Sequence, residues 1–151
     1  MDDRLQTLVA KDLILDTITR LFVGTDQRDW GAVRACLAPR VHFDMTSLAG
    51  SAPADRTAEE IIAGWEEGLR PIEAVHHQAG NYRVEIDGER ARAFCYGIAL
   101  HYRRTRSGRN TRTFVGSYDF GLRVLDGVWR IDAFRFNLKY LDGNLDLERA
   151  E

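Results

Sequence analysis

Four long stretches in the second half of the chain most constrain how it can fold. Alternating side chains predict β-strands over residues 73–87, 90–104, 111–125 and 128–140. The turn signals between these stretches are Asp87-Gly88, Ser107-Gly108 and Asp126-Gly127. Consecutive strands joined by short turns pair antiparallel, so this half predicts an antiparallel sheet.

The first half of the chain predicts three helices. Apolar residues at helical spacing predict a helix over residues 4–24. Asp29 is a good N-cap for a second, short helix before Pro39. Thr57 and Glu60 have the capping-box pattern that opens a third helix.

Between the second and third helices, residues 41–46 alternate as a short strand and residues 47–56 are expected to form a loop over a pocket mouth. Helices followed by a meander of strands predict an α+β domain. We expect three N-terminal helices against an antiparallel sheet of four long strands and one short one. One domain should cover residues 1–151, with a polar, loosely held tail at 141–151.

Composition argues against several classes of protein. The chain has 21 Lys+Arg and 23 Asp+Glu, and this balance argues against binding nucleic acid through its phosphates. The first residues do not form a signal peptide, and no apolar run reaches membrane-spanning length. Cys36 and Cys95 lack metal-binding spacing, so we expect a cytoplasmic protein with reduced thiols.

The predicted strand around residues 93–102 is apolar on both faces. One face has small residues and a histidine: Ala93, Cys95, Gly97, Ala99 and His101. The other has large residues: Phe94, Tyr96, Ile98, Leu100 and Tyr102. The small face leaves volume for a pocket, whereas the large face suits packing against another subunit. We therefore expect a homodimer or higher oligomer that forms through the sheet.

His76 and His77 are the first candidates for acid–base chemistry, because histidine titrates near neutral pH. A bulge expected near Gly80 prevents strand alternation from choosing between them. Asp26 continues the apolar face of the first helix, where it either orients a histidine or caps backbone N–H groups in a turn. His101 either points into the pocket or bonds a carbonyl within the core.

Two other charged groups receive simpler interpretations. His76 and His77 should point to opposite faces of their strand, so with nearby Glu73 they do not make a metal site, and we expect no metal or cofactor. The arginines around the third turn are interpreted as a solvated hairpin end rather than an anion site. They are Arg103, Arg104, Arg106, Arg109 and Arg112.

This order of elements resembles the nuclear transport factor 2-like superfamily, a cone-shaped α+β barrel, and within it the SnoaL-like branch that contains scytalone dehydratase and lindane dehydrochlorinase. Residues 22–28 are similar to the segment with the family's dyad aspartate, which maps onto Asp26. Residues 77–81 are similar to the H-x-x-x-N segment, which maps the dyad histidine onto His77. The segment around His101 resembles the strand with a second active-site histidine.

Two further segments bear on the resemblance. Residues 126–130 are similar to the D-G-x-W-[RK] hairpin of the family. Thr25 and Met45 stand where scytalone dehydratase has tyrosines. These two departures argue against dehydration of scytalone itself and leave the Asp–His base intact.

The resemblance implies a cofactor-independent, dehydratase-like lyase. Asp26 would orient His77 as the base, and His101 would hold or protonate the leaving group or polarise a carbonyl. A small, mostly apolar cyclic or aromatic substrate would contact Phe22, Met45, Trp65, Tyr118, Phe134 and Phe136. The alternatives are an isomerase or cyclase with the same base, a non-catalytic small-molecule-binding protein, and a small structural subunit of an oxygenase.

Overall fold

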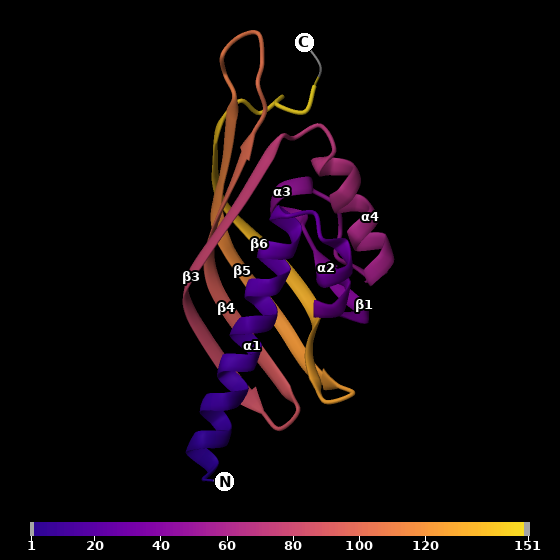
Figure 1. Ribbon diagram of the computed structural model, residues 1–151, viewed down its shortest axis with the longest axis vertical. Coiled ribbons are helices and arrows are strands. Elements are labelled where there is room, and N and C mark those ends of the chain that lie inside the picture. The colour runs from indigo at the N-terminus through magenta and orange to yellow at the C-terminus, as the bar shows by residue number, and fades with distance from the viewer. Residues whose placement is uncertain (1, 150–151) are drawn as a thin grey trace.

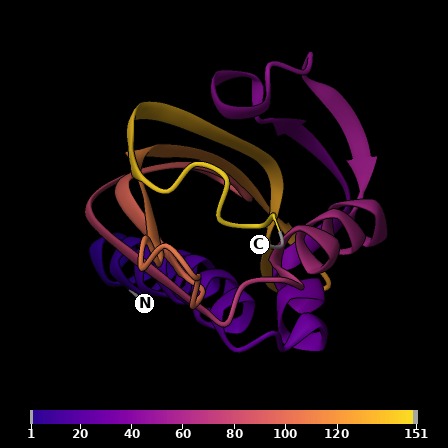
Figure 2. The same cartoon turned by 90° about the horizontal axis from the view of Figure 1, so that it is seen from above.

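The computed structural model describes residues 2–149 and pairs helices with one strongly curved sheet (Figure 1). In chain order the elements are α1 (Asp3–Asp26), α2 (Trp30–Cys36), β1 (Leu37–Asp44), α3 (Thr46–Ala49), β2 (Ala54–Thr57), α4 (Ala58–Leu69), β3 (Ala74–Asp87), β4 (Arg90–Tyr102), β5 (Thr111–Leu125) and β6 (Val128–Gly143). Seen from above, the sheet curves around α1, α2 and α4 (Figure 2). The predicted α+β class and N-terminal helices are confirmed.

The sheet has the strand order β2-β1-β6-β5-β4-β3. The long strands β3 to β6 pair antiparallel in sequence, close to the predicted ranges. β1 pairs parallel with β6, and β2 pairs antiparallel with β1 at the sheet edge. The predicted sheet of four long strands and one short one, all antiparallel, is therefore corrected to a mixed sheet of six strands.

Residues 37–57 differ most from the prediction. β1 begins at Leu37 and includes Pro39, in the stretch where its register with β6 shifts between Leu37 and His42. Proline lacks the N–H that a regular ladder needs, so it is tolerated at such an irregularity. The expected loop at 47–56 contains most of the single turn α3 and of β2.

Side-chain caps set the starts of two helices as predicted. The Asp29 side chain accepts a hydrogen bond of 3.1 Å from the backbone N–H of Ala32, at the start of α2. Thr57 and Glu60 form the reciprocal capping box of α4. These bonds satisfy backbone N–H groups that the first helical turn leaves without partners.

Helix α1 is buried only along its second half. Ile14, Ile18 and Leu21 are almost fully buried against the sheet. Leu5 and Leu8, which the sequence pattern includes in the same apolar stripe, are exposed, because the first turns of α1 extend past the sheet (Figure 1). The packed half ends at Asp26 and therefore fixes the position of that carboxylate.

The expected bulge in β3 is present. The register with β4 shifts between Gly80 and Arg83, and Asn81 has a φ of 58°. His77 faces inward before the shift, and Tyr82 packs against the core after it. The extra residue bends the strand and changes which alternate positions face the helices.

The C-terminal segment packs against the rest of the fold within its described residues, while the loosely held tail expected at 141–151 stays a prediction. β6 runs to Gly143, Asn144 is buried, and Leu147 is 0% exposed. Leu147 packs with Leu69 and Val75 in a small second apolar cluster. Residues 150–151 lie outside the described part of the chain.

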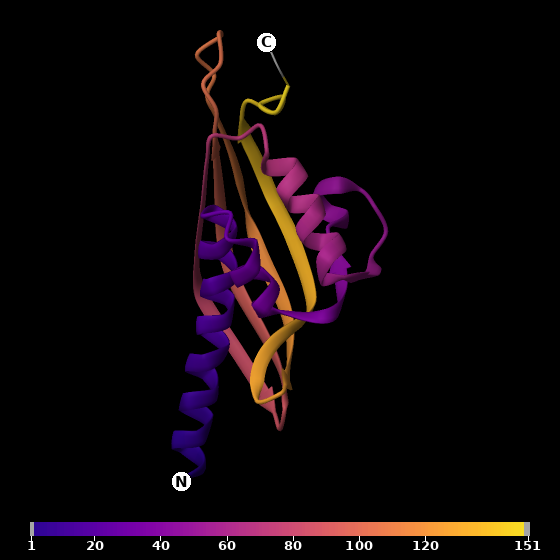
Figure 3. The same cartoon turned by 45° about the vertical axis from the view of Figure 1, so that its right-hand side comes forward.

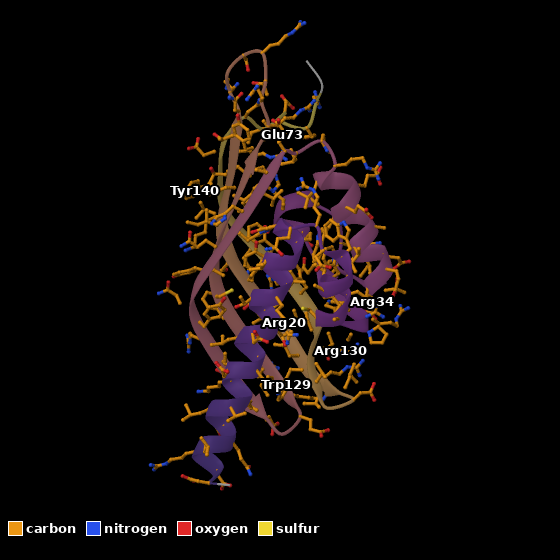
Figure 4. All side chains as sticks on the ribbon, in the orientation of Figure 1. Arg20, Arg34, Glu73, Trp129, Arg130 and Tyr140 are labelled. Carbon is orange, nitrogen blue, oxygen red and sulfur yellow. The ribbon has the colours of Figure 1, made fainter. Side chains whose placement is uncertain are left out.

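The outer face of the sheet points away from the helices and exposes large apolar side chains. Figure 3 shows the helices gathered on the other side, and Figure 4 shows Tyr140 pointing outward. The exposed set is Tyr96, Ile98, Leu100, Tyr102 and Tyr140. Strand β4, which the sequence predicts to be covered on both faces, is thus covered on one face within this chain. Among the described helices, none has the length and hydrophobicity to span a bilayer.

Candidate active site

An apolar cavity of about 190 Å³ lies between the sheet and the helices. Aromatic and aliphatic side chains form most of its wall, and His77 and His101 are its two titratable imidazoles. The lining residues are Leu21, Phe22, Thr25, Met45, Leu48, Trp65, Leu69, His77, Ala99, His101, Phe114, Tyr118, Phe134 and Phe136.

All six side chains that the sequence proposes as ligand contacts lie in this wall: Phe22, Met45, Trp65, Tyr118, Phe134 and Phe136. Asp26 is not part of the lining and bonds His77 instead. Sequence reasoning missed Phe114, although it shares the alternation phase of Tyr118 in β5. Leu48 was missed because it lies in α3, within the segment expected to be a loop.

Asp26 holds His77 through both carboxylate oxygens. Oδ1 lies 2.6 Å from Nδ1 of His77, and Oδ2 accepts a 2.8 Å hydrogen bond from the backbone N–H of His77. Each side chain is 16% exposed. Because a carboxylate only accepts, Nδ1 carries the shared proton, and in the neutral form of the imidazole Nε2 keeps a free lone pair. The imidazole on the cavity wall can therefore accept a proton at Nε2.

Two features of the fold create this pairing. Asp26 is the last residue of α1, and His77 lies in β3 just before the bulge. The alternative interpretation is that Asp26 caps backbone N–H groups in a turn. Asp26 does accept a hydrogen bond from a backbone N–H. The donor, however, lies 51 residues away on the strand, so the carboxylate joins the helix to the sheet.

Phe22 fixes the plane of the His77 ring. The two rings stack with centroids 5.3 Å apart and planes 23° apart. The Tyr118 ring also contacts Phe22, edge-on, with centroids 5.0 Å apart. The imidazole is thus held by a carboxylate along one edge and by an aromatic ring over one face.

Tyr118 lies directly over Gly97 on the neighbouring strand. A Cβ at Gly97 would come within 2.2 Å of the Tyr118 ring, so only glycine leaves room for this ring position. Burial raises the pKa of the Tyr118 hydroxyl, which stays neutral. Tyr118 therefore offers a neutral hydroxyl and an apolar ring to the cavity.

His101 reaches the cavity from β4. In the register of β3 and β4, Val75 pairs with His101 and His77 pairs with Ala99, so the two histidines are diagonal neighbours on one face. Nδ1 of His101 accepts a 3.2 Å hydrogen bond from Nη2 of Arg112 on β5. The partner is thus a guanidinium rather than the core carbonyl considered from the sequence.

The surroundings of His101 keep its ring neutral. Burial is the largest cause, and the positive charge of Arg112 and then His77 add to it, which together hold the pKa of His101 at about 4. The two imidazoles of the site therefore have different kinds of hydrogen-bond partner. His77 is bonded to an acceptor, and His101 is bonded to a donor.

The neighbouring charged residues do not form a metal site. His76 is exposed on the opposite face from His77, and Glu73 accepts a hydrogen bond from the backbone N–H of Arg104. Within residues 2–149, no three side chains of His, Cys, Asp or Glu gather closely enough to hold a metal ion.

Arg103 and Arg112, near the third turn, bind the C-terminal segment, so the interpretation as a solvated hairpin end is wrong for these two arginines. Nη1 of Arg103 donates to the carbonyl oxygens of Leu147, Glu148 and Arg149, at 3.2, 2.9 and 3.2 Å. Arg112 donates to the carbonyl of Leu145 at 3.3 Å and to the Glu148 carboxylate.

Solved structures share this fold at low sequence identity. The Kfla4162 protein from Kribbella flavida superposes with a TM-score of 0.90 and 21% identity, covering 95% of this chain and 99% of its own. A type 2 hexachlorocyclohexane dehydrochlorinase gives a TM-score of 0.79 and 16% identity, covering 99% and 98%. A putative scytalone dehydratase from Novosphingobium aromaticivorans gives 0.79 and 15%, covering 95% and 92%.

No curated protein sequence matches the chain significantly. The SnoaL-like domain family, in contrast, matches residues 6–135, which is most of the sequence. These residues contain both helix and strand of the Asp26–His77 contact, and they end before the C-terminal segment. The chain belongs to the SnoaL-like domain family of the nuclear transport factor 2-like superfamily.

Proposed function

We propose that this protein is a cofactor-independent, dehydratase-like lyase acting on a small, mostly apolar cyclic or aromatic substrate. The observation that carries the proposal is the pairing of Asp26 with His77 at the wall of an apolar cavity. This arrangement orients a base and excludes water around it. Structural neighbours described as a dehydrochlorinase and a putative scytalone dehydratase support elimination as the reaction class.

In the proposed reaction, Nε2 of His77 removes a proton from a carbon atom of the substrate. Asp26 stabilises the imidazolium that forms, because its carboxylate already accepts the Nδ1 proton. The electron pair of the broken C–H bond forms a double bond, and the leaving group departs from the adjacent carbon. A hydroxyl leaves as water after taking a proton from the imidazolium, which restores the base.

The shape of the wall supports an aromatic or cyclic substrate. Trp65, Phe43 and Phe134 contact one another on one side of the cavity. Tyr118 and Phe136 form a further aromatic pair, with centroids 4.9 Å apart. Such rings contribute large apolar contact areas and favour flat ligands.

The reaction class is tested with 3-hydroxycyclohexanone, whose dehydration gives the conjugated ketone cyclohex-2-enone. Appearance of enone absorbance reports elimination directly. We expect His77→Gln to reduce the enzymatic rate by roughly 10²–10⁴-fold. His76→Gln is the matched control, because its side chain is exposed on the other strand face and should leave the rate unchanged.

Three results would count against the proposal. Equal rates in wild-type protein and His77→Gln would remove His77 as the base. Exchange of substrate C–H protons without enone formation would favour the isomerase or cyclase that uses the same base. Tight ligand binding without either reaction would favour a non-catalytic binding protein.

We also propose that the protein self-associates through the outer face of the sheet. Tyr96 and Tyr140 are 46% and 57% exposed there, beside exposed Ile98 and Leu100. A contiguous apolar face of this kind is stabilised by a second copy of the same surface.

A cytoplasmic location is part of the proposal and is supported by the two buried free thiols, Cys36 and Cys95.

A further inference from the structure

Arg112 connects the cavity to the C-terminal segment. Its side chain is only 12% exposed, and its two terminal nitrogens face in different directions. Nη2 donates to Nδ1 of His101, while Nη1 donates to the Leu145 carbonyl and to Glu148. The guanidinium carbon also lies 5.2 Å from the centre of the Phe114 ring. Contacts with the C-terminal segment and with the Phe114 ring therefore fix the position of the Arg112 guanidinium beside His101.

The hydrogen bond from Arg112 decides the tautomer of His101. A guanidinium has only N–H donors and stays charged, so Nδ1 of His101 must be the acceptor and carries no proton. The ring proton of neutral His101 is then on Nε2. His77 has the opposite arrangement, with its proton on Nδ1 toward Asp26.

We propose that Arg112, held by the C-terminal segment, is a positioning residue that fixes His101 as a neutral hydrogen-bond donor to a substrate oxygen. A neutral imidazole N–H is a weak acid, so His101 stabilises negative charge on a carbonyl oxygen instead of protonating a leaving group. This narrows the substrate class to enolisable carbonyl compounds. His77 takes the proton from the α-carbon, and the electron pair moves onto the oxygen that His101 binds.

The catalytic part of this inference rests on the proposed function, whereas the tautomer of His101 does not. The groups that face His101 come from four segments: Arg112 on β5, His77 on β3, Asp26 at the end of α1, and Glu148 in the C-terminal segment. The two positive or potentially positive neighbours oppose protonation, and the two carboxylates favour it. The family match ends at residue 135, so the segment that holds Arg112 lies outside the matched part.

The test is nitrogen-15 NMR of histidine-labelled protein that contains His42→Gln and His76→Gln. Both replaced side chains are exposed, and only His77 and His101 then remain visible. In the otherwise wild-type protein we expect His101 to show an unprotonated Nδ1 and a protonated Nε2 from pH 8 to about pH 5. A proton on Nδ1 of His101 in this pH range would overturn the proposal. This measurement needs no substitution of Arg112.

Arg112→Met should raise the protonation midpoint of His101 by about one pH unit or more, because the adjacent charge and its hydrogen bond are lost. Arg103→Met is the matched control: Arg103 also holds the C-terminal segment, but no hydrogen bond joins it to His101. In Arg103→Met the protonation midpoint of His101 should stay at its wild-type value. An unchanged midpoint in Arg112→Met, or an equal rise in both variants, would contradict a specific positioning role.

The catalytic role of Arg112 is tested by measuring the dehydration of 3-hydroxycyclohexanone. Arg112→Met should lower kcat by roughly 10–10³-fold with little change in KM, since the bond to the oxygen strengthens only as charge develops. A rise in KM at constant kcat would contradict this role. If the wild-type protein performs no elimination, the proposed function fails, and the NMR result still decides whether Arg112 sets the tautomer.

Discussion

Asp26 and His77 lie 51 residues apart in the chain, yet two hydrogen bonds join the Asp26 carboxylate to the ring and to the backbone of His77. One bond sets the ring nitrogen that carries the proton, and the other ties the end of α1 to β3. The orientation of the His77 ring and the attachment of α1 to β3 therefore depend on one carboxylate.

Phe22 should be important for stability because it is buried between His77 and the core aromatics. Phe22→Ala is expected to lower the free energy of unfolding by about 3–5 kcal/mol, from lost burial and the cavity left behind. Urea denaturation measures the change. Leu8→Ala, at an exposed position in the first turns of α1, should stay within about 0.5 kcal/mol of wild type, and an equal loss in both variants would contradict the packing described for Phe22.

Gly97 should control the shape of the cavity. Gly97→Ala places a methyl group against the Tyr118 ring and is expected to push that ring into the cavity. Binding of 2-tetralone, an apolar bicyclic ketone, should weaken at least several-fold by titration calorimetry. Gly64→Ala is the control, since nothing lies within 4 Å of its Cβ in α4, and it should stabilise the helix by up to about 1 kcal/mol. Unchanged affinity in Gly97→Ala would refute the steric argument.

Stability should fall in mildly acidic solution because of His101. Its pKa is about 4 in the folded protein and about 6.5 in the unfolded chain. Between these values the unfolded state binds a proton that the folded state does not, so the stabilisation is complete above pH 6.5 and is lost as pH falls toward 4. We expect a loss of about 1–3 kcal/mol between pH 7 and pH 4.5.

Urea denaturation at the two pH values measures this loss, and His101→Gln should show a smaller one. His42→Gln should keep the wild-type pH dependence, because His42 is exposed and bonded only to exposed Asp55. An identical loss in wild type and His101→Gln would show that other groups cause it.

The outer sheet face should form the contact between subunits. Ile98→Arg introduces a charge at the centre of the exposed face and should convert an oligomer to a monomer in sedimentation velocity. Val23→Arg, at an exposed apolar site on α1, should leave the oligomer intact. A monomeric wild-type protein at micromolar concentration would end the oligomer proposal.

The elements of the second half could be predicted because local signals set them. Asp126-Gly127 fixes the hairpin of β5 and β6, where both residues have positive φ. The parallel pairing of β1 with β6 could not be predicted, since it joins distant segments without a connecting turn. The short strand β2 has no alternation strong enough to separate it from a loop.

In the candidate site, too, local signals could be predicted from the sequence, whereas contacts between distant segments could not. The positions of Asp26 and His77 follow from a helix end and a strand that carries a short motif. The role of Arg112 was missed, although it shares an alternation phase with Phe114 and Tyr118. Its pairing with His101 depends on strand register, and the loop at 103–110 is too long for Ser107-Gly108 to set that register. The buried Leu147 then holds the segment that meets Arg112.

Deuterium exchange at the α-carbon of 2-tetralone tests the central claim most directly, because it requires only a base and no leaving group. Exchange in heavy water is followed by proton NMR for wild type, Asp26→Asn and Asp55→Asn. Asp55 contacts His42 at the surface of the protein. Asp55→Asn is therefore the control for losing an Asp–His contact away from the cavity. We expect wild-type exchange well above the buffer rate, a loss of roughly 10²–10⁴-fold in Asp26→Asn and none in Asp55→Asn. Equal exchange in wild type and Asp26→Asn would contradict the Asp26–His77 base.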